Sequence, residues 1–280
     1  MSNKDKIIFI TGASSGIGRE TALYLAKHGY KVFAGIRKKI DKNELEKLNK
    51  NITGVYIDVT NQSSIDKAFW FILKNTEKID VLINNAGIVT AGPIEIIPIK
   101  KLKEQFDVNT FGVISVTQKF ITLLNDGLII NVSSMASYGI FPYIAPYCAS
   151  KRAMDILLNC LMLENKNNIK VVSVKPSAIS TPIWNKSVKK ARKDFEELNN
   201  SSKHKYEKEL LYLEEKALSN NKKAISPVVV VRTIEKIINT KNPKPSYTVG
   251  KQAAFARFLS ILPQSFVNFL IKHNLKRISK

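Results

Sequence analysis

The sequence predicts an α/β fold built on a doubly wound parallel sheet of about seven strands, and three observations lead to this prediction. Short runs of β-branched and other apolar residues alternate with longer helical patterns from residue 6 to residue 176. The runs are almost continuously apolar, which is typical of strands buried on both faces of a parallel sheet. The first run leads into a glycine-rich turn, "TGASSGIG", and then into an amphipathic stretch. Alternation of this kind favours one doubly wound α/β unit.

The predicted elements follow in order along the chain. We expect strands at residues 6–11, 31–36, 54–59, 80–85, 127–134, 170–176 and 246–250, and helices near 16–29, 43–50, 62–76, 99–124, 147–166 and 226–240. The last helix has the clearest start, because Ser226 suits the N-cap and Pro227 suits the first helical position.

Two segments lie outside this alternation. Residues 183–225 are charged and helix-prone, and they form either a solvated flap or a lid over a site at the strand ends. The tail, residues 251–280, is either a cover for a subunit or domain surface or an anchor on anionic lipid. We expect residues 1–280 to form a single domain with helical insertions. In the tail, apolar residues recur at helical spacing between basic ones, at Phe255, Phe258, Leu259 and Leu262.

Composition limits the classes of protein to consider. The formal net charge is +21, but no zinc-finger, RRM or KH pattern accompanies it, so we expect no nucleic-acid partner. The simpler interpretation is a lysine-rich composition spread over exposed faces. Two cysteines, Cys148 and Cys160, form no disulfide framework. With neither a signal-peptide pattern nor a membrane-spanning run, we expect a cytoplasmic protein, with peripheral membrane association through the tail as the alternative.

The glycine-rich turn is the first candidate for a binding site. Glycines let the backbone turn sharply and approach a pyrophosphate, while the N–H groups that open the next helix point at the same anion. Such a turn is weak evidence alone and strong evidence between a first strand and a helix. We therefore expect a Rossmann-type dinucleotide site that includes Gly12, Ser14, Ser15, Gly16, Ile17 and Gly18.

The end of the second strand indicates which dinucleotide is bound. NAD sites typically carry an acidic residue there for the ribose 2′-hydroxyl, whereas here Ile36 is followed by Arg37 and Lys38. A guanidinium can hold a 2′-phosphate with two parallel hydrogen bonds. The sequence thus favours NADP(H) over NAD(H). The alternative is that Arg37 is one more surface cation.

Two tyrosines have a lysine four residues later, Tyr147 with Lys151 and Tyr212 with Lys216. The second pair shows that this spacing arises readily in a lysine-rich chain. Tyr212 lies in the charged insertion, whereas Tyr147 opens a predicted helix after the fifth strand. That is the edge of the sheet where ligands of open α/β folds bind.

Several motifs in the same order resemble the short-chain dehydrogenase/reductase family over roughly residues 5–250. The glycine-rich turn resembles the cofactor turn of the family, and Asp58 resembles its adenine-contacting acid. "NNAG" at residues 84–87 resembles the segment that steadies the sheet beside the cofactor, and Asn109 resembles the asparagine of the family's catalytic helix. Ser134 stands 13 residues before Tyr147, which is the family spacing, and no comparable serine precedes Tyr212.

The resemblance implies interconversion of a carbonyl and an alcohol by hydride transfer, with Tyr147 as general acid/base. Lys151, one turn later, and the oxidised nicotinamide are expected to lower the phenol pKa from its usual value of about 10. By resemblance, Lys151 also bonds the nicotinamide ribose, Ser134 bonds the substrate oxygen, and Asn109 holds a water of a proton relay. The chain departs from the family at Ser177, where glycine usually follows the proline.

The resemblance also implies further contacts to the cofactor, and it implies no metal site. Besides the residues of the turn, Arg37, Tyr147 and Lys151, these contacts are Lys38, Asp58, Val59, Asn85, Ala86, Gly87, Pro176, Ile179 and Thr181.

The expected pocket segments are 88–98, 135–146 and 183–225. The first two are mostly apolar and favour a hydrophobic ketone or aldehyde. The tail resembles the branch of the family that acts on retinoids, steroids and related lipids. A homodimer or homotetramer through the helices at 99–124 and 147–166 is also implied. The alternative is a non-catalytic NADP-binding or membrane-associated scaffold protein. The predicted substrate pocket contains Ser134, Tyr138, Tyr143, Tyr147 and Trp184.

Overall fold

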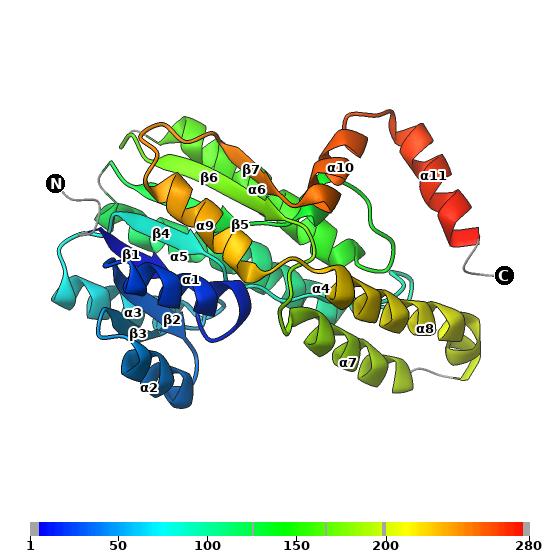
Figure 1. The fold of residues 1–280 in the computed structure, drawn as a ribbon. Coiled ribbons are helices and arrows are strands. Elements are labelled where there is room, and N and C mark those ends of the chain that lie inside the picture. The colour runs from blue at the N-terminus through cyan, green and yellow to red at the C-terminus, as the bar shows by residue number, and fades with distance from the viewer. Residues whose placement is uncertain (1–5, 125, 166, 198–199, 277–280) are drawn as a thin grey trace.

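The computed structural model describes residues 6–124, 126–165, 167–197 and 200–276. Within these residues, seven strands form one parallel sheet in the order β3-β2-β1-β4-β5-β6-β7 (Figure 1). The doubly wound α/β prediction is confirmed, because the order reverses between β1 and β4, where ligands of such folds bind. The strands are β1 (Ile7–Ile10), β2 (Lys31–Ile36), β3 (Ile52–Tyr56), β4 (Val81–Asn84), β5 (Leu128–Val132), β6 (Lys170–Pro176) and β7 (Ser246–Val249).

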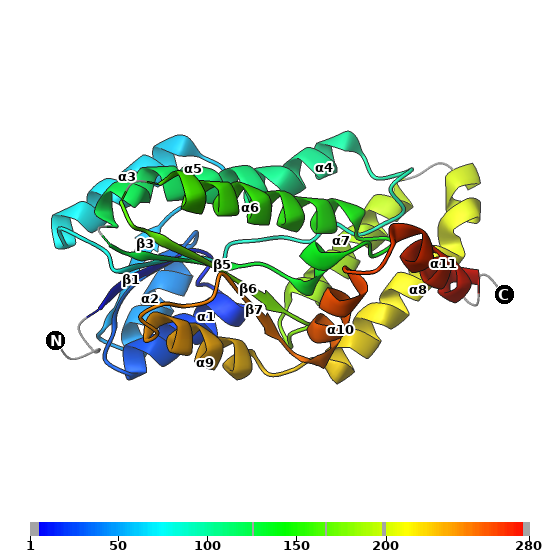
Figure 2. The same cartoon turned by 90° about the horizontal axis from the view of Figure 1, so that it is seen from above.

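Helices cover both faces of the sheet and bury an apolar layer on each (Figure 2). On one face lie α1 (Gly16–Lys27), α2 (Lys39–Leu48) and α9 (Pro227–Ile238). On the other lie α3 (Gln62–Asn75), α4 (Ile99–Phe106), α5 (Gly112–Phe120) and α6 (Ala145–Glu164). Strands β2, β5 and β6 are buried almost throughout, as their continuous apolar runs predict, whereas the edge strand β7 is mostly half-buried.

Most helix predictions agree with the structure to within a few residues. The start of α9 is confirmed, with the Ser226 hydroxyl accepting a hydrogen bond from the Val228 N–H at 3.3 Å. The single helix predicted at 99–124 is wrong in one respect. Its middle, Asp107–Phe111, is a π-helical turn between α4 and α5, and a 3₁₀ turn, Ile121–Leu123, ends it.

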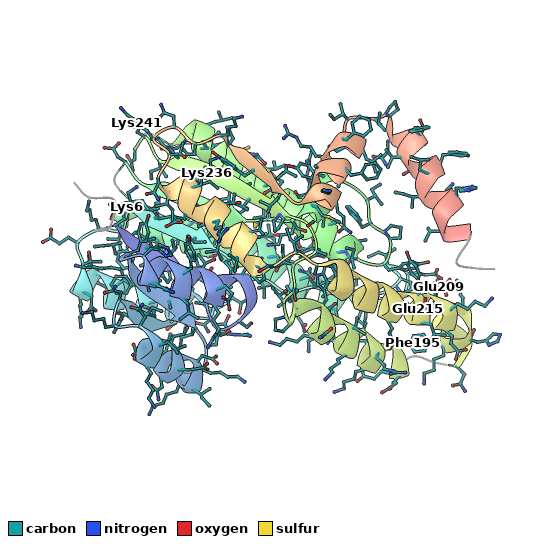
Figure 3. All side chains as sticks on the ribbon, viewed as in Figure 1. Lys6, Phe195, Glu209, Glu215, Lys236 and Lys241 are labelled. Carbon is teal, nitrogen blue, oxygen red and sulfur yellow. The ribbon has the colours of Figure 1, made fainter. Side chains whose placement is uncertain are left out.

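The two segments outside the alternation form helical pairs beyond the carboxyl ends of the strands (Figure 1). The insertion contains α7 (Ile183–Glu196) and α8 (Asn200–Lys223), and the tail contains α10 (Lys251–Leu259) and α11 (Gln264–Lys276). A β-bridge between Ile179 and Ile225 closes the base of the insertion. Lys6, Lys236 and Lys241 mark the opposite end of the molecule, away from Glu209 and Glu215 on α8 (Figure 3).

Candidate active site

The glycine-rich turn between β1 and α1 is shaped for a close approach of another molecule to the backbone. Gly12 and Gly16 have φ angles of +68° and +59°, which favour glycine. A Cβ on Gly18 would lie 2.4 Å from the carbonyl oxygen of Gly12, so no side chain fits there. The glycines therefore let the turn pack closely against its neighbours, while Gly12 and Gly16 also line a cleft at the start of α1, where a pyrophosphate would bind.

The segment after β4 holds this turn in place. The Thr11 hydroxyl accepts hydrogen bonds from the N–H groups of Asn85 and Ala86, both at 3.1 Å. In return, the Asn85 side-chain amide donates to the carbonyl oxygens of Thr11 and Gly12 at 2.9 and 3.0 Å. These contacts join the ends of β1 and β4 at the point where the strand order reverses.

The far end of the cleft carries the residues expected to meet the adenosine. Burial acts to raise the pKa of Asp58, but hydrogen bonds from Thr60 and the charge of Arg37 outweigh it, so the pKa lies below its usual value. Arg37 and Asp58 both line the cleft. Lys38 is exposed and lies outside the cleft at the N-cap of α2, so the structure separates these two cations.

Tyr147, Lys151 and Ser134 converge on the other end of the cleft. Tyr147 is 8% exposed on the first turn of α6, which begins two residues earlier than predicted. Its phenol has the Ser134 hydroxyl as hydrogen-bond partner. The Lys151 ammonium, one turn further along α6, donates to the carbonyl oxygen of Val132 at 2.8 Å.

The expectation that Lys151 lowers the pKa of Tyr147 is wrong for the protein chain alone. Burial raises the pKa of Tyr147 to about 12, and the hydrogen bond with Ser134 offsets only part of this. Burial also lowers the pKa of Lys151 to about 8, against the charge of Asp155. The physical reason is desolvation, which disfavours both charged forms in this enclosed place. The effect of an oxidised nicotinamide stays a prediction.

Asn109 lies beneath the cleft on the π-helical turn and is fully buried. Its side-chain oxygen accepts from the Ile88 N–H at 2.9 Å, and its side-chain nitrogen donates to the Ile88 carbonyl at 3.0 Å. A Cβ built on Gly87 would lie 3.3 Å from the Asn109 oxygen and 3.6 Å from the Lys151 nitrogen. Asn109 and Lys151 thus approach the same glycine from two helices.

The departure at Ser177 is accommodated by a glycine on the neighbouring strand end. Ser177 donates its backbone N–H to the Val249 carbonyl at 2.9 Å. A Cβ on Gly250, which has φ +97°, would lie 2.4 Å from the Ser177 hydroxyl. Thr181, four residues after Ser177, packs against Gly16. A Cβ on Gly16 would lie 3.2 Å from the side chain of Thr181.

These residues enclose a cavity of about 350 Å³, which we call the cofactor cleft. Its shape and chemistry fit a dinucleotide, with a glycine turn at its centre and a cation beside an acid at one end. Gly18, Lys38 and Asn109 do not line it, and Tyr138 and Tyr143 lie elsewhere. The predicted residues that line it are Gly12, Ser14, Ser15, Gly16, Ile17, Arg37, Asp58, Val59, Asn85, Ala86, Gly87, Ser134, Tyr147, Lys151, Pro176, Ile179, Thr181 and Trp184.

A second cavity of about 830 Å³, which we call the apolar chamber, adjoins the cofactor cleft at Trp184. The Trp184 ring stands edge-on to Tyr147, with the ring centres 6.3 Å apart. The walls come from residues 138–142 and Ile144, the helical pair α7–α8 and the tail helices α10–α11. The predicted pocket segments omitted the tail, which contributes Phe255, Leu259, Leu262, Val267, Leu270 and Ile271.

The two remaining aromatic pocket candidates have different places. Tyr138 lines the apolar chamber, and its hydroxyl shares a hydrogen bond with the Thr248 hydroxyl at 2.6 Å. Tyr143 has φ +66°, and its ring packs against Tyr212 of α8 with centres 5.9 Å apart. Tyr212, the tyrosine that also has a lysine four residues later, is therefore part of the wall of the apolar chamber.

Sequence reasoning missed a buried charged network behind the site. Asp155 accepts hydrogen bonds from Ser133 at 3.1 Å and Ser173 at 2.9 Å, and it pairs with Lys175 at 2.8 Å. The signal was available, because Asp155 follows Lys151 by one helical turn and so shares its buried face.

Comparisons with known proteins agree with this geometry. Residues 6–192 match the family model of the short chain dehydrogenases. The chain is 30% identical to the NADPH-dependent 3-dehydrocapnine reductase of Ornithobacterium rhinotracheale, covering 97% of this chain and 98% of that protein. It is 30% identical to the 3-ketodihydrosphingosine reductase of Bacteroides thetaiotaomicron, with 95% and 97% covered. A solved short-chain dehydrogenase from Streptomyces avermitilis covers 99% of both chains with a TM-score of 0.77 at 22% identity. This chain belongs to the short-chain dehydrogenase family and is an oxidoreductase.

Proposed function

We propose that the chain is an NADP(H)-dependent enzyme that interconverts a hydrophobic ketone or aldehyde and its alcohol, and that its substrate carries a long apolar chain. The observation that carries this proposal is the apolar chamber next to Tyr147 at Trp184. The two relatives named above support it, since both are reductases and one has a sphingosine-type lipid in its name. A sugar or a small anion would leave the apolar walls unused.

The side chains of the cleft have distinct roles in this reaction. When bound, the nicotinamide supplies or accepts the hydride. Tyr147, which burial keeps protonated at neutral pH, donates its proton to the substrate oxygen, and Ser134 hydrogen-bonds the same oxygen as charge develops. Lys151 holds the cofactor ribose from the floor of the cleft. Asn109 fixes the backbone beside Gly87 and holds the relay water.

Arg37 is proposed to select NADP(H) by binding the 2′-phosphate. We expect Arg37→Ser to raise the KM for NADPH by about tenfold to a hundredfold, because one or two charge-assisted hydrogen bonds to the 2′-phosphate are lost. The KM for NADH should not change. Lys38→Ser is the matched control, because Lys38 is exposed outside the cleft. Equal efficiency of wild type with NADH and NADPH would reject the preference.

Turnover of a homologous series of straight-chain ketones tests the substrate class. Each added CH₂ that enters the apolar chamber contributes about 0.8 kcal/mol, so kcat/KM should rise about fourfold per carbon until the chamber is full. A flat series, with steroid or retinoid carbonyls preferred, would reject the long-chain substrate.

Tyr147→Phe should abolish turnover and retain NADPH binding, measured by fluorescence, while Tyr143→Phe stays active. Unchanged turnover in Tyr147→Phe would reject Tyr147 as the general acid, whereas NADPH binding without any turnover in wild type would favour the non-catalytic scaffold.

Exposed apolar faces support two further proposals about partners. Ile156 and Leu163 on α6 and Phe111 at the end of the π-helical turn are exposed. The helices α5 and α6 belong to one layer (Figure 2), where a homodimer or homotetramer would pack. Phe258 and Phe269 on the tail are 58% and 65% exposed and face away from the apolar chamber, which fits peripheral membrane contact. Light scattering of Leu163→Ser tests the first, and liposome flotation of Phe258→Ser/Phe269→Ser tests the second.

Among the described residues, no helix is both long and apolar enough to cross a membrane. We propose that residues 1–280 work as one domain in the cytoplasm, with any membrane contact peripheral.

A further inference from the structure

Ser187 on α7 has a buried hydroxyl for which the described residues provide no hydrogen-bond partner. The residue is 4% exposed, and its side-chain oxygen makes no hydrogen bond within the described part of the chain. Leaving a hydroxyl buried and unpaired is unfavourable, so such groups are uncommon in folded proteins. A partner that binds from outside the chain would remove this cost.

The position of Ser187 separates it from the other unpaired groups. Within the described residues, six buried side-chain atoms lack a partner, on Thr21, Asn84, Thr90, Asn131, Ser187 and Ser246. Of these six residues, Ser187 alone lines either the cofactor cleft or the apolar chamber, and it lines both.

Ser187 and Trp184 both line the cofactor cleft and the apolar chamber, so both lie where the two cavities meet. The two residues are three apart on α7 and therefore lie on one face of the helix, roughly 5–6 Å apart at their Cβ atoms. The Trp184 ring contacts Tyr147, so Ser187 lies about one helical turn further from the reacting group. Its surroundings on the chamber side are apolar, with Val188 and Ala191 on the same helix.

We propose that Ser187 forms a polar subsite, and that the substrate carries a hydroxyl or similar uncharged hydrogen-bonding group between its reacting carbonyl and its apolar chain. This inference rests on the proposed function and deepens it. A plain ketone chain would pass Ser187 and leave the hydroxyl unpaired. A hydroxylated chain would pair with it, since serine can both donate and accept.

The test compares hexadecan-2-one with analogues that carry a hydroxyl two to five carbons from the carbonyl. We expect at least one analogue to have a kcat/KM about tenfold above that of the plain ketone, the size of one buried hydrogen bond. Ser187→Ala should remove this advantage and leave the plain ketone unaffected. Ser246→Ala is the matched control, because it also deletes an unpaired buried hydroxyl but lies away from both cavities.

Two further measurements keep the outcomes distinct. Thermal unfolding of Ser187→Ala should be unchanged or slightly raised; a clear loss of stability would show that the hydroxyl serves the fold, and would overturn the subsite. If wild type reduces no ketone, the proposed function fails, and calorimetric binding of hexadecan-2-ol and the matching diols still decides the subsite. Equal effects of Ser187→Ala on plain and hydroxylated ligands would overturn it, as expected if a water satisfies the serine.

Discussion

Lys151 should make the stability of the protein depend on pH in a way that a single substitution removes. Burial lowers the pKa of this lysine from 10.5 to about 8. Between these values the unfolded chain holds a proton that the folded chain does not, so stability rises with pH from about 8 to 10.5. Stability is correspondingly lost as the pH falls towards 8. The full difference corresponds to roughly 3 kcal/mol.

The assay is urea unfolding of cofactor-free protein, followed by circular dichroism between pH 8 and pH 10. Lys151→Met keeps the length of the side chain and removes the titrating group. The free energy of unfolding of wild type relative to the variant should rise by about 2 kcal/mol over this range. Tyr147 titrates equally in both proteins and cancels. A pH-independent difference would show that the buried ammonium keeps its ordinary pKa, and would refute the reasoning.

Two further substitutions test the packing around the site. Gly250→Ala should destabilise the protein by about 1–3 kcal/mol, because Gly250 has a positive φ and lies close to the Ser177 hydroxyl. Chemical denaturation should show that adding Ser177→Gly restores part of this stability. If it restores none, the backbone strain at residue 250 alone causes the loss. Asp155→Ala should cost about 3–5 kcal/mol by leaving Lys175 as an unpaired buried charge, and adding Lys175→Met should recover stability. Additive losses in this double variant would contradict the pairing.

The sequence was sufficient for the sheet and for the cofactor cleft because both depend on short-range patterns. Near-continuous apolar runs mark parallel strands, and the carboxyl ends of such strands meet at one edge. The spacing of Ser134, Tyr147 and Lys151 therefore translated directly into convergence at the cleft. The positive φ of Gly12 and Gly16 fits the sharp turn that the glycine-rich motif predicts after the first strand.

The parts that could not be predicted depend on distant packing. Nothing in the pattern around Asn109 marks the π-helical turn, because α4 and α5 on either side read as one amphipathic helix. The pKa of Tyr147 depends on its degree of burial, to which Ile183 and Trp184 on α7 contribute from far along the chain. The tail showed an apolar stripe, but its partner, the apolar chamber, exists only once α7 and α8 have folded back over the strand ends.

The tail helices carry apolar residues both in the wall of the apolar chamber and on the exposed surface, so the two interpretations of the tail are compatible. Leu259 and Leu270 line the apolar chamber and are half-buried, whereas Phe258 and Phe269 are exposed. A stripe that only covered a domain surface would have no need of the exposed pair. A stripe that only bound lipid would leave the chamber without a wall. The same two helices can therefore enclose an apolar chain on one side, and the proposed membrane contact on the other side would place the chamber next to the phase in which long-chain ketones are most soluble.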